Sequence, residues 1–325
     1  MRNSPSNRLR RNTMASSQST FVHLIAGGIA GTVGSSLTCP LEVVKTRLQS
    51  SVTTFHATTC VSGVGTVPIQ VSYQKPTGIL MCLKNIIQHE GVPALFRGLG
   101  PTLIGIAPSR AIYFSFYATA KNKFNRSGWL VPESKMVHMM SACSAGLFTS
   151  TATSPLWVCK TRLQLYNGRR QRLWRVIFSI YQKEGIRGYY RGLSASYVGV
   201  TETCIHFVIY EHIKSRLRVH KLQTRGGQKS AFDFVEFMLA AATSKSIASI
   251  VAYPHEVVRT RLRQQESDGS RRYHSFFQTL KKIALEEGRR GLYSGLGTQL
   301  IRQIPNTALV FLTYEAIVSF LCKED

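Results

Sequence analysis

The sequence predicts an all-α membrane protein in which six transmembrane helices form three pseudo-threefold repeats, each with a short helix between its two spans. Three observations support this fold class: a proline-led charged motif that occurs three times, a Glu-Gly signature after each copy, and long runs without Asp, Glu, Lys or Arg. Two such runs are Phe21–Leu41 and Met136–Val158. Each reaches the ~20 residues that a helix needs to cross a bilayer.

Both signatures align without gaps in all three copies. The first reads PLEVVKTRLQ from Pro40, PLWVCKTRLQ from Pro155 and PHEVVRTRLR from Pro254. The second reads EGVPALFRG at 90–98, EGIRGYYRG at 184–192 and EGRRGLYSG at 287–295. Three two-part matches in the same order indicate an internal repeat.

The two signatures divide the chain into a tail and three repeats. A basic N-terminal tail at 1–19 precedes repeats at 20–126, 127–222 and 223–325. In the first repeat the two signatures lie farther apart than in the others, and the excess is rich in Ser, Thr, Val and Gly. We therefore expect a loop insertion at about 50–73.

The charge balance limits the classes of partner. Lys and Arg total 41 against 16 Asp and Glu, a formal net charge of +25, which suggests nucleic acid, anionic lipid or a phosphate-bearing solute. The long uncharged runs and the lack of a nucleic-acid-binding motif argue against a soluble nucleic-acid-binding protein. An enzyme is also disfavoured, because no phosphate loop, nucleophile elbow or metal-spaced His/Cys set is present. We expect no cofactor and no metal site.

Three charged residues interrupt the later hydrophobic spans. They are Arg110, Glu202 and Lys245. A charge at bilayer depth costs a few kcal/mol or more, so such residues usually face the interior of a helix bundle or a wet cavity. The spans are therefore expected to surround a polar path.

These motifs resemble those of the mitochondrial carrier family (solute carrier family 25), whose marker is P-x-[DE]-x-x-[KR]-x-[KR] followed by [DE]-G-x4-[FWY]-[KR]-G in each of three repeats. The resemblance covers about Phe21 to Leu321. Within the family, the sequence is most similar to the pyrimidine nucleotide carriers. The features of that branch are Trp157 in place of the second acid, the first-repeat insertion, APSRAIYF at 107–114, YPHEVVRTRLR at 253–263 and LIRQIPNTA at 300–308.

The resemblance implies exchange of pyrimidine nucleotides (UTP, dTTP, CTP and their diphosphates) by alternating access. A carrier of the same fold for NAD, for FAD or folate, or for adenine nucleotides is the alternative. The resemblance also implies a multi-pass monomer in the mitochondrial inner membrane. Both of its termini would lie on the intermembrane-space side, and cardiolipin would be a lipid partner. The Arg-rich, acid-free start of the chain is similar to a mitochondrial targeting segment, or is a disordered basic tail.

The proline motif has a geometry suited to a gate. Proline kinks a helix, and its acid and base, three residues apart, lie on nearly one face. By resemblance, each acid meets the base of the next repeat on the matrix side, here Glu42 with Lys160 and Glu256 with Lys45. Trp157 leaves Arg259 without an ionic partner, although its guanidinium can stack on the indole. The residues expected at this matrix gate are Glu42, Lys45, Gln49, Trp157, Lys160, Gln164, Glu256 and Arg259, with Arg263 departing from the family's bracing glutamine.

The resemblance predicts a second, cytosolic gate with the pattern [FY]-[DE]-x-x-[KR]. Only the second repeat has it intact; the first lacks the acid at Ala118 and the third lacks the base at Val318. Pairing Glu211 with Lys121 and Glu315 with Lys214 leaves no charge stranded, so we prefer it to the opposite direction. The residues expected at this gate are Lys121, Tyr210, Glu211, Lys214, Tyr314 and Glu315.

Candidate substrate contacts lie between the two gates. Arg302 is expected to bind phosphate, because a guanidinium offers a fork of donors. With Arg110 and Lys245 it would form a cationic belt for a triphosphate, and Glu202 would accept hydrogen bonds from the base or ribose. Each cation has an alternative role in an ion pair with Glu202 or with another helix. The expected contacts are Gly105, Ile106, Arg110, Val198, Gly199, Glu202, Lys245, Arg302 and Gln303.

Overall fold

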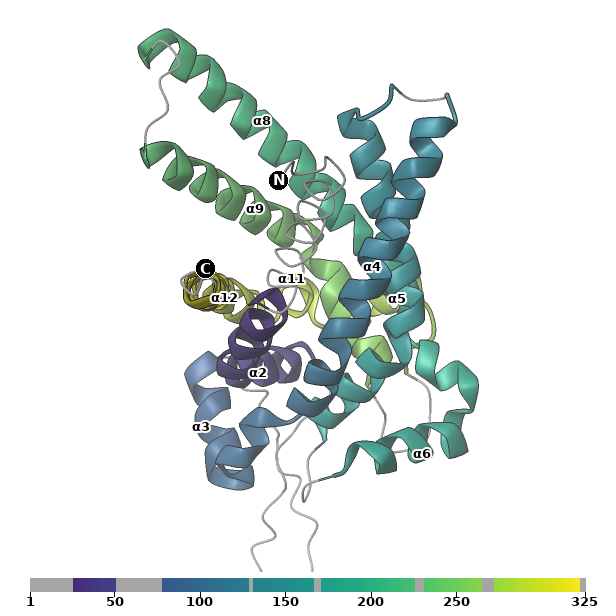
Figure 1. Cartoon of the computed structure of the whole chain (residues 1–325). Helices are drawn as coiled ribbons and strands as arrows, with labels where there is room; N and C mark the ends of the chain where they lie inside the picture. The colour runs from purple at the N-terminus through teal and green to yellow at the C-terminus, as the bar shows by residue number, and fades with distance from the viewer. Residues whose placement is uncertain are drawn as a thin grey trace, which may run out of the picture.

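The structure is a computed structural model that describes residues 26–50, 78–128, 131–166, 171–225, 231–264 and 272–321. Within these ranges the chain is helical and has no β-strand (Figure 1). The predicted tail at 1–19 and nearly all of the predicted insertion at about 50–73 lie outside the described residues.

The helices follow the same order in each third of the chain. A proline-containing helix comes first, followed by a short amphipathic helix, a single helical turn and a further long helix, which in the second third is divided in two. The first third contains α2 (Cys39–Gln49), α3 (Ile79–Glu90), η1 (Val92–Phe96) and α4 (Leu99–Arg126). The second contains α5 (Lys135–Leu165), α6 (Leu173–Glu184), η2 (Ile186–Tyr190), α7 (Leu193–Val198) and α8 (Val200–Arg225). The third contains α9 (Ala231–Arg263), α10 (Phe276–Glu286), α11 (Gly288–Leu292) and α12 (Leu296–Leu321).

The motif prolines lie in the first helix of each third. Pro155 and Pro254 lie inside α5 and α9, and Pro40 lies in the first turn of α2. Residues 26–37 are also helical and are separated from α2 by a break at Thr38. Because proline removes one backbone donor and crowds the preceding turn, it bends or interrupts each helix at the same point of the repeat.

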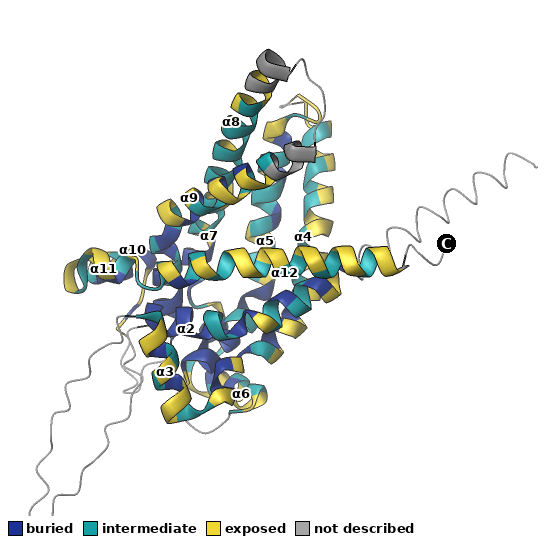
Figure 2. Ribbon diagram, turned by 90° about the vertical axis from the view of Figure 1, so that its left-hand side faces the viewer, coloured by how far each residue is buried: buried dark blue, intermediate teal, exposed yellow. Residues whose placement is uncertain are grey.

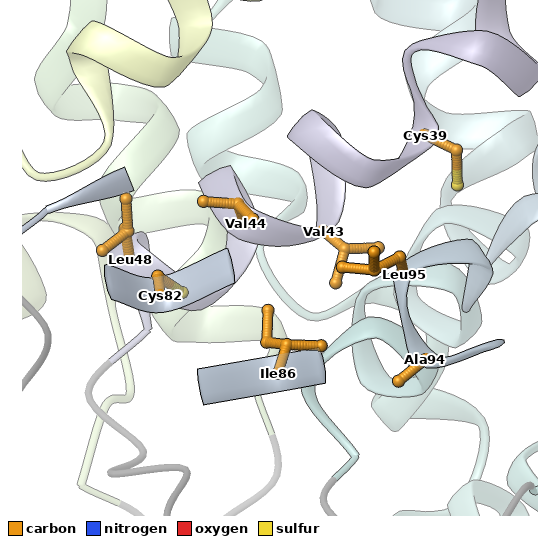
Figure 3. Packing of buried hydrophobic residues seen from close by; sticks show 8 residues of the cluster. All are labelled: Cys39, Val43, Val44, Leu48, Cys82, Ile86, Ala94 and Leu95. Carbon is orange, nitrogen blue, oxygen red and sulfur yellow. The ribbon is translucent and has the colours of Figure 1, made fainter. Parts of the chain in front are cut away.

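Each short amphipathic helix packs on the proline helix of its own repeat. In the first repeat, Val43 and Val44 of α2 meet Cys82 and Ile86 of α3, and Leu95 completes the cluster (Figure 3). Residues four apart share a helix face, which is why Cys82 and Ile86 are buried together. The equivalent clusters contain Val158, Cys159, Leu163, Val176 and Ile180 in repeat two, and Val257, Val258, Leu262, Phe276 and Ile283 in repeat three. Apolar burial is therefore divided among three small, similar cores.

The Glu-Gly signature ends on a glycine that no other residue can replace without strain. Gly98 has a φ of +85°, in the left-handed region, and Gly192 and Gly295 at the equivalent positions have φ values of +75° and +83°. A Cβ on Gly98 would lie 2.8 Å from Cγ of Gln164 in the next repeat. The glycine therefore allows both the turn into α4 and close contact between repeats.

Replacing Gly98 with alanine is expected to lower the free energy of unfolding by about 1–3 kcal/mol, because the positive φ and the contact with Gln164 both resist a side chain. The matched control is Gly100→Ala, inside α4, where a Cβ meets nothing within 4 Å. That change should raise stability by up to about 1 kcal/mol, since alanine favours a helix over glycine. Thermal unfolding of the purified protein measures both; equal midpoints for the two variants would contradict the prediction.

The two longest helices have a polar composition along much of their length. With 31 and 33 residues, α5 and α9 are about 46 and 50 Å long. Among the helices that the structure describes, none combines sufficient length with the apolar composition of a membrane span. The uncharged run Met136–Val158 lies within α5, where Ser, Thr and Gly lower its mean hydropathy.

Buried residues gather where the three proline helices converge. In Figure 2 they are concentrated around α2 and the adjoining parts of α5 and α9, whereas α12 and the described residues of α8 are mostly intermediate or exposed. The pairs α4 with α5 and α8 with α9 lie side by side. The free end of α12 runs away from that of α8, so the molecule is closed at one end of the bundle and spread at the other.

Candidate functional site: a cationic cavity on a ring of ion pairs

Two ion pairs join the proline helices of different repeats. Lys45 Nζ on α2 lies 2.6 Å from Glu256 Oε2 on α9, and Lys160 on α5 pairs with Glu42 on α2. No more than 17% of any of these side chains is exposed. They are the two pairs expected from the sequence, and they join the first repeat to both of its neighbours.

Trp157, which stands where the second motif lacks its acid, is contacted by a cation of its own helix. Lys160 Nζ lies 4.8 Å from the centroid of the Trp157 ring, three residues earlier on α5, so this contact joins no two repeats. Arg259 lies 3.2 Å from Glu256, three residues earlier on its own helix. Trp157 therefore does not leave Arg259 without an ionic partner, and stacking of Arg259 on the indole stays a prediction. A carboxylate one turn away on α9 offers the guanidinium an ionic partner within the same repeat.

Arg302 adds a cation from α12 to the ring. Its Nη1 lies 3.1 Å from Glu42 Oε2, so Glu42 is shared between Lys160 and Arg302. The sequence offered this residue either as a phosphate ligand or as a member of an ion pair with another helix. The structure contains the ion pair and leaves about a quarter of the side chain exposed (24%).

A second ring, not foreseen from the sequence, is formed by the last base of each motif. These arginines are almost fully buried, with side chains 1%, 3% and 0% exposed. Each donates through Nε to a backbone carbonyl of the next repeat: Arg47 to Gln164, Arg162 to Arg263, and Arg261 to Gln49. Each also pairs with the glutamate of its own Glu-Gly signature, which is Glu90, Glu184 or Glu287. The three arginines thereby link the repeats in a closed circle.

The two expected bracing glutamines contact threonines beside the ion pairs. Thr46 donates to Gln164 Oε1 at 2.9 Å, and Thr260 donates to Gln49 Oε1 at 2.8 Å. Both contacts cross from one repeat to another. In the third position Arg263, the departure from the family pattern, donates to Ser196 at 3.1 Å.

A cavity of about 460 Å³ is lined by the ion-pair ring. Five basic side chains and two acidic ones face it, leaving an excess of three positive charges. Such an excess in a hollow with low-dielectric walls attracts a polyanion. The charged lining residues are Glu42, Lys45, Lys160, Glu256, Arg259, Arg263 and Arg302.

Polar atoms without partners also line this cavity. Ser109 Oγ, Thr149 Oγ1 and Gln299 Oε1 are buried and have no hydrogen-bond partner among the described residues. A buried polar group left unpaired costs about 1–3 kcal/mol. A solute with donors and acceptors would satisfy these atoms, so the cavity suits a polar anion better than a simple ion.

The predicted cationic belt is not assembled. Lys245 lies 2.6 Å from Glu202, which also accepts a hydrogen bond from Ser249 at 2.8 Å. Arg110 is exposed and makes no ion pair with a described residue. Of the three cations only Arg302 lines the cavity. The structure therefore contains, for Lys245, the ion-pair alternative that the sequence left open.

The predicted glycine contacts are sites of close helix packing. A Cβ on Gly105 would lie 2.4 Å from Leu156 on α5, and one on Gly199 would lie 2.8 Å from His255 on α9. The other three of these predicted contacts have different surroundings. Ile106 lies near Gly31, and Val198 packs against a buried cluster. Gln303 has a buried Oε1 without a partner among the described residues. None of these five residues lines the cavity.

The predicted cytosolic pairs are not formed, because two of their charges pair with residues just before and at the start of α5. Lys121 lies 2.8 Å from Glu133, and Glu211 pairs with Lys135. The hydrogen bond from Lys121 lowers the pKa of the Glu133 carboxyl. Lys214 lies over the ring of Tyr210, 5.2 Å from its centroid.

The third-repeat members of that gate are no closer together. Glu315 is exposed and has no ion-pair partner among the described side chains, and Tyr314 precedes it on α12. Because α12 runs away from α8 (Figure 2), the predicted pair of Glu315 with Lys214 is not formed. The physical reason is that the ion-pair ring is closed at the opposite end of the bundle.

The sequence is similar to a protein family and to several transporters along almost its whole length. A family model described as "Mitochondrial carrier protein" matches residues 16–128, 132–221 and 230–325. Solute carrier family 25 member 36-A of Danio rerio is 52% identical over 319 residues, covering 94% of this chain and 99% of the relative. Solute carrier family 25 member 33 of Homo sapiens is 47% identical over 319 residues, covering 94% and 96%. The mitochondrial pyrimidine nucleotide transporter of Saccharomyces cerevisiae is 37% identical over 324 residues, covering 93% and 86%.

The three matched segments contain all three proline motifs and all three Glu-Gly signatures. Identities near one half extend over almost the whole of both chains. Together with the threefold ring of inter-repeat contacts, these matches show that the chain belongs to the mitochondrial carrier family.

Proposed function

We propose that this protein carries pyrimidine nucleotides, such as UTP, dTTP, CTP and their diphosphates, across the mitochondrial inner membrane by exchange. The observation that carries the proposal is the cavity with an excess of three positive charges on a ring of ion pairs. A nucleoside di- or triphosphate is a polyanion with donors and acceptors on its base and ribose, which fits both the cations and the unpaired polar atoms. The name of the yeast relative, a mitochondrial pyrimidine nucleotide transporter, directs the choice of base.

In this proposal the molecule is a carrier rather than an enzyme, and its six long helical segments span the inner membrane. Their charged and polar residues face the interior of the bundle, where charge is tolerated best. Both termini lie on the intermembrane-space side. Antibodies against tags at both ends should therefore bind mitoplasts, which lack the outer membrane, without detergent; protection of either tag would contradict this orientation.

In the proposed transport cycle the matrix gate opens as the cytosolic gate closes, so that the cavity faces the two sides of the membrane in turn. Lys45 with Glu256 and Lys160 with Glu42 form the matrix gate, and the cavity is accessible from the cytosolic side. An entering polyanion competes with Glu42 for Arg302, loosening the ring. The cytosolic gate then closes through Lys121, Tyr210, Glu211, Lys214, Tyr314 and Glu315, which requires Lys121 and Glu211 to leave Glu133 and Lys135. The other predicted contact residues touch the substrate during this change. They are Gly105, Ile106, Arg110, Val198, Gly199, Glu202, Lys245 and Gln303.

We further propose that the protein works as a monomer in contact with cardiolipin. Helix α6 exposes Trp174, Phe178 and Tyr181 beside Arg172 and Arg175. Aromatic and basic side chains on one short helix suit the boundary between acyl chains and anionic head groups.

The test is exchange in proteoliposomes loaded with UTP and challenged with labelled UTP, dTTP, ATP, NAD and folate. Fast uptake of UTP and dTTP with slow uptake of the others is expected. ATP uptake as fast as UTP uptake would reject the choice of pyrimidine, and failure of every nucleotide would reject a phosphate-binding cavity.

The substitution Arg302→Lys tests the role of the guanidinium. It keeps the charge but loses the fork of donors, so the KM for UTP is expected to rise about tenfold, equivalent to about 1.4 kcal/mol. The control is Arg272→Lys, an exposed arginine paired with Glu286, which should leave the KM unchanged. An unaltered KM in Arg302→Lys would place the phosphates elsewhere.

A further inference from the structure

The transport cycle leaves unused a pair of thiols that face each other across two helices. Sγ of Cys143 on α5 and Sγ of Cys204 on α8 lie 3.2 Å apart, and both residues are only partly buried. A disulfide bond is about 2.05 Å long, so the sulfurs need to approach by only about 1.2 Å. The other described cysteines, Cys39, Cys82 and Cys159, are buried.

The thiol pair lies in the middle of an antiparallel contact. Toward one end of it, a Cβ on Gly146 would lie 3.7 Å from Val200, and Thr151 bonds Tyr197 of α7 at 2.7 Å. Toward the other end, Lys135 at the start of α5 pairs with Glu211 of α8. Residue numbers rise along α5 as they fall along α8, so these contacts form one continuous seam.

A mainly apolar cavity adjoins the two helices at the level of the thiol pair. A cavity of about 400 Å³, lined mainly by aromatic and other apolar residues, lies beside the seam. Ala142 and Thr203 line it, and each is the chain neighbour of one of the two cysteines. Because the wall is apolar, hydrogen peroxide suits this space better than a charged disulfide.

We infer that Cys143 and Cys204 form a reversible disulfide that holds the carrier open to the cytosol. Hydrogen peroxide oxidises one thiol to a sulfenic acid and releases water; the second thiol then displaces hydroxide from that sulfur, forming the S–S bond and a second water. Two thiols thus lose two electrons and two protons, and the peroxide O–O bond is reduced. A thiol reductant restores both cysteines.

The consequence for transport rests on the proposed alternating access. To close the cytosolic gate, Glu211 must leave Lys135 and move toward Lys121, which changes how α8 lies on α5. A covalent bond in the middle of the seam prevents the two helices from sliding or separating. The oxidised molecule is therefore held in the arrangement that the structure describes and cannot complete a cycle.

The experiment measures the bond and transport separately. Purified carrier in proteoliposomes is treated with hydrogen peroxide, digested without reduction and searched by mass spectrometry for a peptide linking Cys143 to Cys204; UTP exchange is measured on the same samples. Exchange is expected to fall in proportion to the linked fraction and to recover with dithiothreitol. Recovery distinguishes the disulfide from methionine sulfoxide, which dithiothreitol does not reverse under these conditions.

Three variants complete the test, each normalised to its own rate before oxidation. Cys143→Ser and Cys204→Ser should form no link and keep their exchange rate under peroxide. Cys159→Ala, which removes a buried thiol from the same helix α5, should behave as the unmodified protein. Absence of the linked peptide overturns the inference, as does a linked protein that exchanges at full rate. If the untreated protein fails to exchange pyrimidine nucleotides, the proposed function fails while the peptide measurement still decides whether the bond forms.

Discussion

Replacing Arg261 with methionine is expected to lower the free energy of unfolding by about 3 kcal/mol, the range found when one member of a buried ion pair is removed. The Arg261 side chain has no exposed surface and pairs with Glu287. It also donates to the Gln49 carbonyl of the first repeat and to the Tyr273 hydroxyl. Methionine preserves much of the apolar stem, so the loss reports the contacts of the guanidinium.

The matched control for this prediction is Arg272→Met. That arginine pairs with Glu286 in the same repeat, but the two side chains are 47% and 40% exposed. An exposed pair contributes about 1 kcal/mol or less. Thermal unfolding of the detergent-solubilised protein compares the two variants, and a similar midpoint for both would mean that the arginine ring does not hold the repeats together.

Reversing one charge of the matrix gate is expected to reduce UTP exchange about 100-fold or more, as a loss of roughly 3 kcal/mol would. In Lys45→Glu two carboxylates would face each other where Lys45 and Glu256 now lie 2.6 Å apart. The double variant Lys45→Glu with Glu256→Lys restores opposite charges and should recover exchange to within about tenfold of the original rate. Full recovery is not expected, because Glu256 also pairs with Arg259.

The control reverses an ion pair that is not part of the ring. Arg272→Glu, Glu286→Arg and their combination alter an exposed pair on the third repeat and should leave exchange unchanged. A double gate variant as inactive as its parent single variants would show that Lys45 and Glu256 do not act as a pair during transport.

The ion pairs of the matrix gate were predictable because they depend on spacing and repetition. Proline and base recur at the same offsets in all three copies and the acid in two of them, and the family resemblance then pairs Glu42 with Lys160 and Glu256 with Lys45. The same repetition also contained Arg47, Arg162 and Arg261. Their threefold recurrence was a usable signal, but it carried no indication that each one reaches a backbone carbonyl of another repeat.

The positions of the other charges could not be predicted, because helical phase does not specify which competing partner a long side chain meets. Arg302 was expected to bind the phosphates and forms an ion pair with Glu42. Lys245 was expected in the same cationic belt and forms an ion pair with Glu202.

At the cytosolic end, the pattern indicated Lys121 with Glu211, yet Lys121 pairs with Glu133 of the loop before α5 and Glu211 pairs with Lys135 at the start of α5. Which partners Lys121 and Glu211 meet depends on which end of the bundle is closed. The same sequence forms both the state with a closed matrix gate and the state with a closed cytosolic gate, so it does not indicate which pairs a given structure contains.

The arginine ring, formed by Arg47, Arg162 and Arg261, has a consequence for how the chain folds during synthesis. Arg47 and Arg162 each bond forward to the repeat that follows, but Arg261 bonds back to Gln49 in the first repeat. During synthesis the circle therefore stays incomplete until the third repeat has emerged. An intermediate with two repeats can form only the Arg47 hydrogen bond among these three inter-repeat contacts. The third repeat adds the other two and so joins three similar units into one cooperative structure.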